Sequence, residues 1–307
     1  MSEADLLCPE GSVVTVGSFD GVHLGHQAII AQVVERAAKR GAAGLLVTFE
    51  PHPGSVLPKG GAPARLTTSA ERLELVAELG LERMVTLRFD AALAALPAER
   101  FVTEVLLARC GMKELVLGAD HGFGQGRGAD RQNLPELGAR YGFAVSVVDP
   151  VADARGEAVS STRIRTALAA GKLDQVSQWL GRPYRIAARV VPGAGRGRTI
   201  GIPTINLEGP PPEKALPPDG VYAALVEWGG GTAGAMLNQG PRPTVGDAQR
   251  SLEAHLFGVA QELYGRMVRV EWVERLRDVQ RFPSLDALRA QLALDRDAAL
   301  RILARPR

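Results

Sequence analysis

The stretch Ser12–His26 (SVVTVGSFDGVHLGH) decides the fold of the first half of the chain. It opens with Ser12–Gly17, an apolar, β-branched run that ends in glycine and is typical of a buried strand. Residues 25–40 then carry apolar side chains at helical spacing, and Gly41 stands where a helix should stop. A strand that passes through a glycine-rich turn into a helix forms the phosphate-binding end of an open α/β sheet.

The same alternation of strand and helix continues to about residue 180. Further strands are predicted at Ala43–Thr48, Met84–Phe89, Glu114–Leu117 and Phe143–Val148, and further helices at Ser69–Leu79, Ala98–Arg109 (with Gly111 as its terminator) and Arg131–Tyr141. Strands and helices in regular alternation predict a doubly wound α/β domain, in which a parallel sheet has helices on both faces.

The pattern changes after Leu180, where consecutive strand-like runs are separated by clusters of glycine and proline. The predicted strands are Arg185–Val191, Gly220–Trp228, Ala233–Leu237, Leu252–Phe257 and Met267–Leu276. A helical pattern returns only at Leu285–Leu303, behind the capping residue Ser284. This predicts a small antiparallel β-barrel or sandwich with a terminal helix. The predicted domains are residues 1–180 and 181–307.

Composition excludes several classes of protein. With 307 residues, 46% of them hydrophobic and 23% charged, the chain is long enough for two globular domains with a core each. Lys and Arg number 36 against 34 Asp and Glu, without a basic cluster, so nucleic acid is not an expected partner. Cys8 and Cys110 are too few for a disulfide scaffold or a thiolate zinc site. No apolar run is long enough to span a membrane, and no secretion signal opens the chain, so we expect a cytoplasmic protein.

Two histidines follow the glycine-rich turn, and three interpretations are open for them. His23 and His26 lie three residues apart at the predicted helix start, where glycines let the backbone approach a ligand closely. Imidazole N–H groups at such a helix start can stabilise the charge that builds up on a phosphoryl group during transfer. The alternatives are a surface turn with two solvent-exposed histidines, or a metal site that would lack a carboxylate partner.

A second phosphate-binding signal lies at residues 160–165. Three hydroxyl side chains, Ser160, Ser161 and Thr162, precede an apolar-periodic stretch, so one of them is expected to cap a helix. With Arg163 and Arg165 close by, this helix end suits a triphosphate or pyrophosphate. Plain N-capping beside two exposed arginines is the alternative.

A third signal lies within residues 181–207. Glycines and arginines alternate there, which is typical of a basic loop over phosphates but also of a mobile hairpin: Gly193, Gly195, Arg196, Gly197 and Arg198. Thr204 and Asn206 point the same way if their segment is a strand. A hydroxyl and an amide oxygen are hard ligands that suit Mg²⁺ held mainly by nucleotide phosphates.

Four blocks in the first half resemble the HxGH nucleotidyltransferase superfamily, in the variant carried by bacterial FAD synthetases. They occur in the family's order: GSFDGVHLGH at residues 17–26, TFEPHP at 48–53, GADHGFG at 118–124 with Arg127, and SSTRIR at 160–165. The resemblance implies a set of nucleotide-binding residues, namely Gly17, Phe19, Asp20, Gly25, Ser161, Thr162, Arg163 and Arg165.

The third block departs from the family pattern GxDFxFGxxR. His121 and Gly122 replace the aromatic and basic pair that many relatives carry. Asp120 and Gly124 still match, and Phe123 is left as the candidate for stacking on flavin or adenine. The resemblance therefore implies flavin contacts by Asp120 and Phe123, and it leaves the substrate contacts of this block in question.

The second half resembles the riboflavin kinase module. Its hallmark GxPTAN stands as GIPTIN at residues 201–206, followed in order by GVY at 220–222, NQGPRPT at 238–244, EAHL at 253–256, LYG at 263–265 and LRDVQRF at 276–282. Ile205 and Gln239 are mild variations, and Val279 replaces an acidic residue, which leaves the flavin-side lid of this block in question. The resemblance implies nucleotide contacts by Gly195, Arg196 and Gly201, metal contacts by Thr204 and Asn206, and flavin contacts by Asn238 and Arg277.

Glu253 is the candidate base of this module. A kinase needs a group that takes the proton from the attacking hydroxyl, and the resemblance assigns that role to Glu253. On its residues alone, the segment is an alternating strand with Leu252, Ala254 and Leu256 facing inward and one exposed acid between them. His255 shares the face of Glu253 and is expected to pack or to form a hydrogen bond rather than to act as a ligand.

Together the two resemblances span roughly residues 12–300 and imply a bifunctional riboflavin kinase and FAD synthetase. The C-terminal domain would phosphorylate the 5′-hydroxyl of riboflavin with ATP and Mg²⁺. The N-terminal domain would let the FMN phosphate attack the α-phosphorus of a second ATP, with His23 and His26 stabilising the transition state and pyrophosphate leaving. No covalent enzyme intermediate is implied, because FMN brings its own nucleophile.

Three alternatives stay open. In the first, only the kinase module is active, given the changes at His121 and Gly122. In the second, the chain is a flavin sensor without turnover, although a sensor has no reason to keep a base. In the third, the N-terminal domain acts on another phosphorylated substrate, which the attached kinase module disfavours. The sequence leaves open the oligomeric state, the passage of FMN between domains and the redox form of the flavin.

Overall fold

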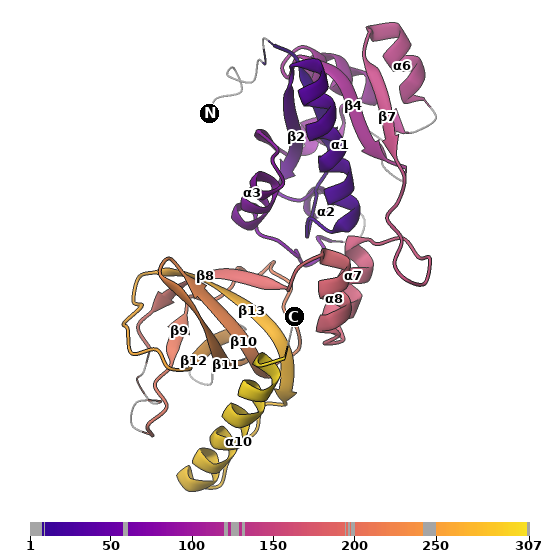
Figure 1. Cartoon of the computed structure of the whole chain (residues 1–307). Helices are drawn as coiled ribbons and strands as arrows, with labels where there is room; N and C mark the ends of the chain where they lie inside the picture. Colours follow the sequence, from indigo (N-terminus) through magenta and orange to yellow (C-terminus); the bar gives the residue numbers. More distant parts are fainter. Residues whose placement is uncertain are drawn as a thin grey trace. The chain divides into compact units, whose positions relative to one another are not determined.

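The structure is a computed structural model that describes residues 8, 10–57, 61–119, 122–123, 129–130, 133–193, 195, 197, 200–241 and 250–305. The chain forms two compact units, Met1–Arg163 and Ile164–Arg307 (Figure 1). Each unit has its own sheet, and each is described by itself below.

The first unit is built on a five-stranded sheet whose pairings are all parallel. Its strands are β1 (Ser12–Val16), β2 (Ala43–Glu50), β3 (Arg83–Arg88), β4 (Met112–Gly118) and β7 (Ala144–Val148). They lie in the order β3-β2-β1-β4-β7, so the direction of winding reverses between β1 and β4. The predicted doubly wound fold is confirmed.

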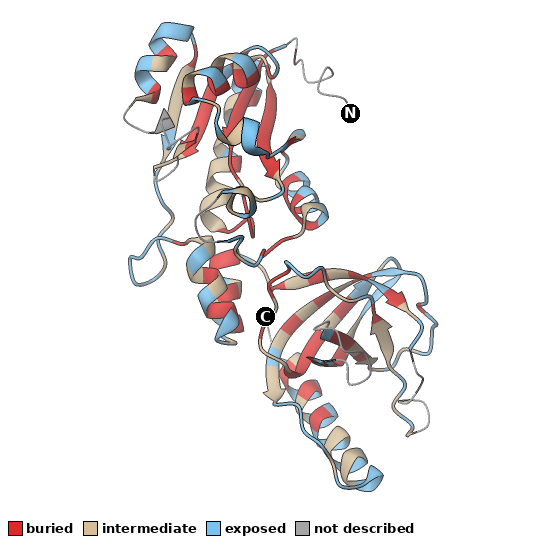
Figure 2. Cartoon of the chain, turned by 180° about the vertical axis from the view of Figure 1, so that it is seen from behind, coloured by how far each residue is buried: buried red, intermediate tan, exposed pale blue. Residues whose placement is uncertain are grey.

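Helices cover both faces of this sheet, and alternate residues of β1 face the two sides. Val13 packs in a core with Ile30 and Val33 of α1 (Leu24–Arg40). Val14 and Val16 pack in a second core, which also holds residues of α5 (Ala98–Arg100) and η2 (Phe101–Leu107). The central strands β1, β2 and β4 are therefore buried on both sides almost throughout, as the residue colouring of Figure 2 shows, whereas the edge strands β3 and β7 are partly exposed.

Local signals mark several helix ends, most of them at or near the predicted positions. Helix α1 ends at Gly41, whose φ of 59° is the left-handed conformation that glycine adopts without strain. Helix α3 (Ser69–Glu78) starts with a capping box formed by Thr68 and Glu71. Helix α6 (Leu134–Tyr141) begins at Leu134, three residues later than predicted, with Pro135 in its first turn.

The predicted helix Ala98–Arg109 has a different internal geometry. It starts as α5 and continues as η2, a π-helix in which Ala108 N–H donates to Thr103 O and Cys110 N–H to Val105 O. The Thr103 hydroxyl donates to the Glu99 carbonyl at 3.0 Å, a back-bond that competes with regular helical bonding. Two short helices, α2 (Pro53–Val56) and α4 (Ala91–Ala94), and the pair β5 (Gly122–Phe123) and β6 (Ala129–Asp130) were not predicted.

The second unit is a closed barrel of six strands in the order β10-β11-β12-β9-β8-β13, all paired antiparallel. The strands are β8 (Arg185–Val191), β9 (Ile205–Leu207), β10 (Gly220–Trp228), β11 (Gly231–Pro241), β12 (Arg250–Leu256) and β13 (Met267–Arg277). A barrel rather than a sandwich forms because β13 pairs with both β8 and β10. Helix α10 (Leu285–Leu303) starts behind the Ser284 cap, as predicted, and packs on β10 and β11.

Two helices connect the sheet to the barrel, α7 (Ser161–Ala169) and α8 (Leu173–Leu180). Helix α8 was not predicted; its buried residues Leu173, Val176, Trp179 and Leu180 form one apolar face, and the helix contacts β13. The compact units accordingly divide between Arg163 and Ile164, inside α7. The functional domains at 1–180 and 181–307 stay a prediction. Within the described residues, the structure has no helix that is long and apolar enough to cross a membrane.

Gln239 is a fully buried polar residue of the barrel. Its amide oxygen accepts a hydrogen bond from Trp272 Nε1 at 3.1 Å, and its amide nitrogen donates to the Pro217 carbonyl at 2.6 Å. Because both partners are buried, the side chain satisfies two polar groups that would otherwise lie unpaired in the barrel interior.

We predict that Gln239→Leu destabilises the barrel by about 1–3 kcal/mol, because it leaves the Trp272 N–H and the Pro217 carbonyl without a partner. Unfolding is followed by tryptophan fluorescence, which reports on this unit because all three tryptophans lie within it. Gln280→Leu, at an exposed position, is the control. Equal melting temperatures for the two variants would contradict the prediction.

Candidate active sites

A cavity of about 350 Å³ opens where the winding of the parallel sheet reverses. It is lined by residues at the carboxyl ends of β1 and β4 and by residues that follow β7, including Gly17, Ser18, Gly118, Ala119 and Asp149. Such a switch point is where open α/β sheets bind their ligands. The Gly17–His26 turn therefore lies in the position that the sequence predicted.

The two histidines lie side by side in this cavity. The rings of His23 and His26 are stacked with centroids 3.7 Å apart, and Phe19 packs on His26 at 4.6 Å. His23 is the N-cap of α1, with Nδ1 accepting from His26 N–H at 3.4 Å, which places the proton of a neutral ring on Nε2. A Cβ at Gly25 would lie 3.2 Å from the His23 ring, so glycine here leaves room for the imidazole. His23 is buried, which excludes the interpretation of two solvent-exposed histidines.

The N-terminus of α7 forms another part of the cavity wall. Ser160, Ser161 and Thr162 all line the cavity. The Ser160 hydroxyl accepts from Arg163 N–H at 3.4 Å, and the Ser161 hydroxyl donates to the Asp20 carbonyl at 2.8 Å. The predicted cap therefore forms, and it also ties α7 to the turn that carries the histidines.

Arg163 points toward a neighbouring loop. Its guanidinium donates to Asp153 at 2.8 Å, to Glu157 at 2.6 Å, and to the carbonyls of Glu157 and Ala158. Hydrogen bonding to Arg163 is the main reason why the pKa of Asp153 falls to about 2. Ala158 lines the cavity, whereas neither Arg163 nor Arg165 does. Arg163 thus holds a cavity-lining loop, and pyrophosphate binding by the two arginines stays a prediction.

Two further N-terminal predictions, the flavin contacts of Asp120 and Phe123, concern the block at 118–124. Phe123 is buried in the core with its ring 5.4 Å from that of Phe101, and it is not among the cavity-lining residues. Its flavin contact stays a prediction. Asp120 and His121 lie outside the described residues, as does Arg196 of the second domain.

In the barrel, strand pairing brings three predicted residues into one row. Glu253 on β12 is the direct partner of Asn238 on β11 and of Asn206 on β9. Side chains at directly paired positions lie on the same face of a sheet. Leu252, Ala254 and Leu256 are buried while Glu253 is half-buried, so the predicted alternation is confirmed.

The glycine-rich loop lies close to this row. A Cβ at Gly193 would come within 2.0 Å of the Asn206 amide nitrogen, and one at Gly197 would lie 2.2 Å from the Ile202 carbonyl oxygen and 3.3 Å from Thr204 Oγ1. Gly195 and Gly201 both have positive φ, at 69° and 79°. The loop backbone therefore lies directly against the two candidate metal ligands.

A cavity of about 250 Å³ lies beside Thr204. Its lining is mostly apolar and includes Val190, Ile205, Leu256, Leu263 and Tyr264. Thr204 precedes β9, so the condition under which it and Asn206 were expected to point the same way, a strand that holds both, is not met. Thr204 lines the cavity, and Asn206 lies in the row with Glu253. His255 Nδ1 lies 2.7 Å from the Pro203 carbonyl, which confirms the hydrogen-bonding role expected for it.

Arg277 is bound to α10. Its guanidinium donates to Asp295 from Nε at 2.9 Å and from Nη2 at 2.7 Å, and it lies 5.5 Å from the Phe282 ring. Gln291 donates to the same carboxylate. This ion pair joins the end of β13 to the helix, and the flavin contact predicted for Arg277 stays a prediction. The structure has no group of three or more His, Cys, Asp or Glu side chains suited to a metal ion in the part of the chain that it describes.

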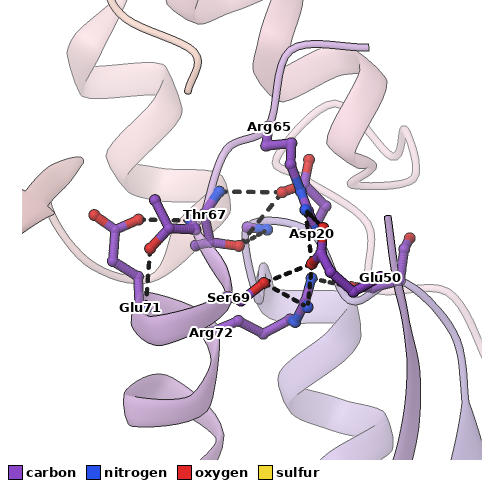
Figure 3. Close-up of polar contacts among 10 residues, drawn as sticks. Asp20, Glu50, Arg65, Thr67, Ser69, Glu71 and Arg72 are labelled. Atoms are coloured by element: carbon purple, nitrogen blue, oxygen red, sulfur yellow. Dashed lines mark hydrogen bonds and ion pairs between the residues drawn. The ribbon is translucent and has the colours of Figure 1, made fainter. Parts of the chain in front are cut away.

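A polar cluster around Asp20, a residue of the turn that carries the histidines, was not predicted (Figure 3). It joins Asp20 and Glu50 to Arg65, Thr67 and Arg72 from distant parts of the unit. Glu50 belongs to the TFEPHP block noted above, but nothing in the spacing of the two arginines indicated that they meet it.

Comparisons with known proteins agree with the two-site architecture. The FAD synthetase family matches residues 6–163, and the riboflavin kinase family matches residues 180–303. The bifunctional riboflavin kinase/FMN adenylyltransferase of Escherichia coli K12 is 40% identical over 287 residues, which cover 93% of this chain and 91% of that protein. The protein of the same description from Pseudomonas fluorescens is 40% identical over 297 residues, covering 96% and 94%.

A solved structure is similar over the whole length. It is a Streptococcus pneumoniae protein described as a macrolide-efflux protein, with a TM-score of 0.86, 32% identity and coverage of 97% of this chain and 96% of that one. The fold and the two sites define a two-domain transferase of phosphoryl and adenylyl groups. The chain belongs to the family of bifunctional riboflavin kinases and FMN adenylyltransferases, which convert riboflavin to FMN and FMN to FAD.

We predict that Gly193→Ala lowers the kcat/KM of the riboflavin kinase for ATP by roughly tenfold or more, because its Cβ would displace the Asn206 side chain. Gly229→Ala is the matched control, since nothing lies within 4 Å of a Cβ at that position. Initial rates of FMN formation from riboflavin measure the effect, and equal rates for both variants would contradict it.

Proposed function

We propose that adenylyl transfer takes place in the cavity at the switch point of the N-terminal sheet. The observation that carries this proposal is the stacked pair His23 and His26 at the N-terminus of α1, facing a second helix N-terminus that presents Ser161 and Thr162. The FMN phosphate attacks the α-phosphorus of ATP; one P–O bond forms, and the bond to the β-phosphate oxygen breaks. The imidazoles and helix N–H groups stabilise the charge that develops on the α-phosphate oxygens.

The row Asn206–Glu253–Asn238 supports phosphorylation of riboflavin in the barrel. We propose that Glu253 accepts the proton of the riboflavin 5′-hydroxyl as its oxygen attacks the γ-phosphorus of ATP, and ADP leaves. The cavity beside Thr204 suits the adenine of that ATP, because its lining side chains are largely apolar and because Thr204, which lines it, lies close to Gly197 of the glycine loop. Asn238 and Asn206 flank Glu253 on opposite sides. Because Asn206 lies on the side of the nucleotide, we propose that Asn238 contacts the flavin.

Mg²⁺ is the divalent ion that we propose for the kinase site. A hydroxyl at Thr204 and an amide oxygen at Asn206 are neutral hard donors, and the loop backbone approaches both. Two such donors suit an ion whose other ligands are phosphate oxygens and water. When bound, the ion would neutralise phosphate charge during transfer. We further propose that the chain acts in the cytoplasm on riboflavin, FMN and ATP, where both of its cysteines stay free thiols.

Glu253→Gln should lower FMN formation from riboflavin by at least about a hundredfold, because the amide no longer accepts the hydroxyl proton. FAD formation from supplied FMN and ATP should stay at the wild-type rate, since the variant leaves the first unit unchanged. Chromatographic separation of riboflavin, FMN and FAD measures both reactions. Loss of both activities in a folded protein would contradict the assignment to two separate sites.

His26→Ala should have the opposite effect. FAD formation from FMN should fall by about a hundredfold or more, because a donor to the transferring phosphate and the partner of the His23 ring are lost. FMN should then accumulate from riboflavin at the wild-type rate. If the wild-type chain itself stops at FMN, only the kinase module is active; if it turns over neither substrate, the sensor interpretation is favoured.

A further inference from the structure

The turn that carries the histidines holds an unfavourable backbone conformation. Phe19 and Val22 have φ of 46° and 41°, in the left-handed region. A positive φ is uncommon for any residue other than glycine and is a genuine outlier for a β-branched residue such as valine. Such conformations persist only where the surrounding structure over-determines them, and they cluster at functional sites.

Hydrogen bonds from residues 66–67 hold Asp20 and Gly21 in the middle of this turn. The Asp20 carboxylate accepts hydrogen bonds from Leu66 N–H and Thr67 N–H, both at 3.1 Å, and Gly21 N–H donates to the Thr67 hydroxyl at 3.0 Å. Asp20 and Thr67 are both buried. Figure 3 shows Asp20 in contact with Thr67, which lies in the segment that precedes α3.

Arg72 of α3 holds the start of the same turn. Its side chain is completely buried, and Nη1 donates to the Ser18 carbonyl at 3.1 Å. Nη2 lies 3.7 Å from Glu50 Oε2 and 3.5 Å from Ser69 Oγ. Burial lowers the pKa of Arg72, Arg65 lowers it further, and Glu50 and Asp20 oppose this.

Ser18 directly precedes Phe19, the first of the two residues with positive φ. Phe19 packs on His26, which stacks on His23, and all three line the cavity. A shift of Ser18 therefore moves Phe19 and both imidazoles together. Packing alone does not require a cation here, because an apolar side chain could fill the same space without the desolvation penalty of a buried charge.

We propose that Arg72 is a positioning residue for adenylyl transfer, acting through the Ser18 carbonyl to hold Phe19 and the histidine pair in their reactive arrangement. The inference rests on the proposed location of adenylyl transfer at His23 and His26. Glu50 keeps Arg65, at 2.6 Å, when Arg72 is replaced, so the substitution leaves no unpaired carboxylate.

The test is a single-turnover measurement with full-length enzyme in excess over FMN and saturating ATP. We expect Arg72→Met to lower the rate constant of FAD formation roughly ten- to hundredfold while its amplitude stays complete. A role in folding alone would lower the amplitude and leave the rate constant unchanged, because the remaining folded molecules react normally. That result would overturn the proposal.

Arg83→Met is the matched control: it removes another ion-paired arginine of the same unit, at the opposite end of β3 from the site. It should keep the wild-type rate constant, and a loss equal to that of Arg72→Met would overturn the proposal. The riboflavin kinase rate of each variant should stay within about twofold of wild type, because that site lies in the other unit.

Two conservative variants keep the test decisive if Arg72→Met does not fold. Arg72→Lys keeps the charge without the guanidinium fork, and Thr67→Val removes the hydroxyl that binds Gly21 N–H. Both should lower the rate constant by a smaller factor, and wild-type values in both would overturn the proposal. His26→Ala in the same assay separates the proposed location of adenylyl transfer from the proposed role of Arg72. If His26→Ala leaves the rate constant unchanged, the proposed location is wrong. If His26→Ala lowers the rate constant but the Arg72 variants do not, only the proposed role of Arg72 is wrong.

Discussion

The pairing of β1 with β2 on one side and β4 on the other is the constraint on which the N-terminal domain depends. The chain winds outward from β1 to β3, and then returns past β1 to β4 and β7. Because parallel crossovers are right-handed, the reversal places the two sets of helices on opposite faces. They diverge at the carboxyl ends of β1 and β4, and the cavity opens there. The turn that follows β1 therefore forms part of the cavity wall.

In the barrel, hydrophobic packing sets the position of a polar group. Pairing places Asn206, Glu253 and Asn238 in one row, and the buried residues Leu252 and Ala254 flank the carboxylate on β12. A slip of β12 by one residue would exchange the two faces of the strand and bury Glu253 in the apolar core. The register that the core requires is therefore also the register that the proposed kinase chemistry requires.

Sequence patterns predicted what local chemistry determines. The bounds of β10 and α10 agree with the structure because alternation, apolar spacing and the Ser284 cap all lie within the segment. Helix α8 was missed, although its apolar face and the following Gly181 were visible in the sequence. The π-helical bonding of η2 was not predictable, since a change from i+4 to i+5 bonds leaves little trace in apolar spacing. The motifs indicated the residues at the two helix N-termini that line the N-terminal cavity, and the roles assigned to them stay predictions. They did not indicate the contacts of Arg163 and Arg277, whose partners follow no spacing rule.

The positions of the arginines in the N-terminal domain explain why the positions of basic residues in the sequence do not mark the candidate adenylyl-transfer site. The described residues that line its cavity include no lysine or arginine. Phosphate groups there would meet backbone N–H groups, hydroxyls and imidazoles, which bind anions without a fixed positive charge. Arg72 instead donates to the Ser18 carbonyl, and Arg163 donates to the Ala158 carbonyl. Ser18 and Ala158 line the cavity, whereas the two arginines do not. Among the described residues, therefore, two arginines fix the shape of the cavity wall, while helix N-termini, hydroxyls and imidazoles face the cavity where the proposed adenylyl transfer would take place.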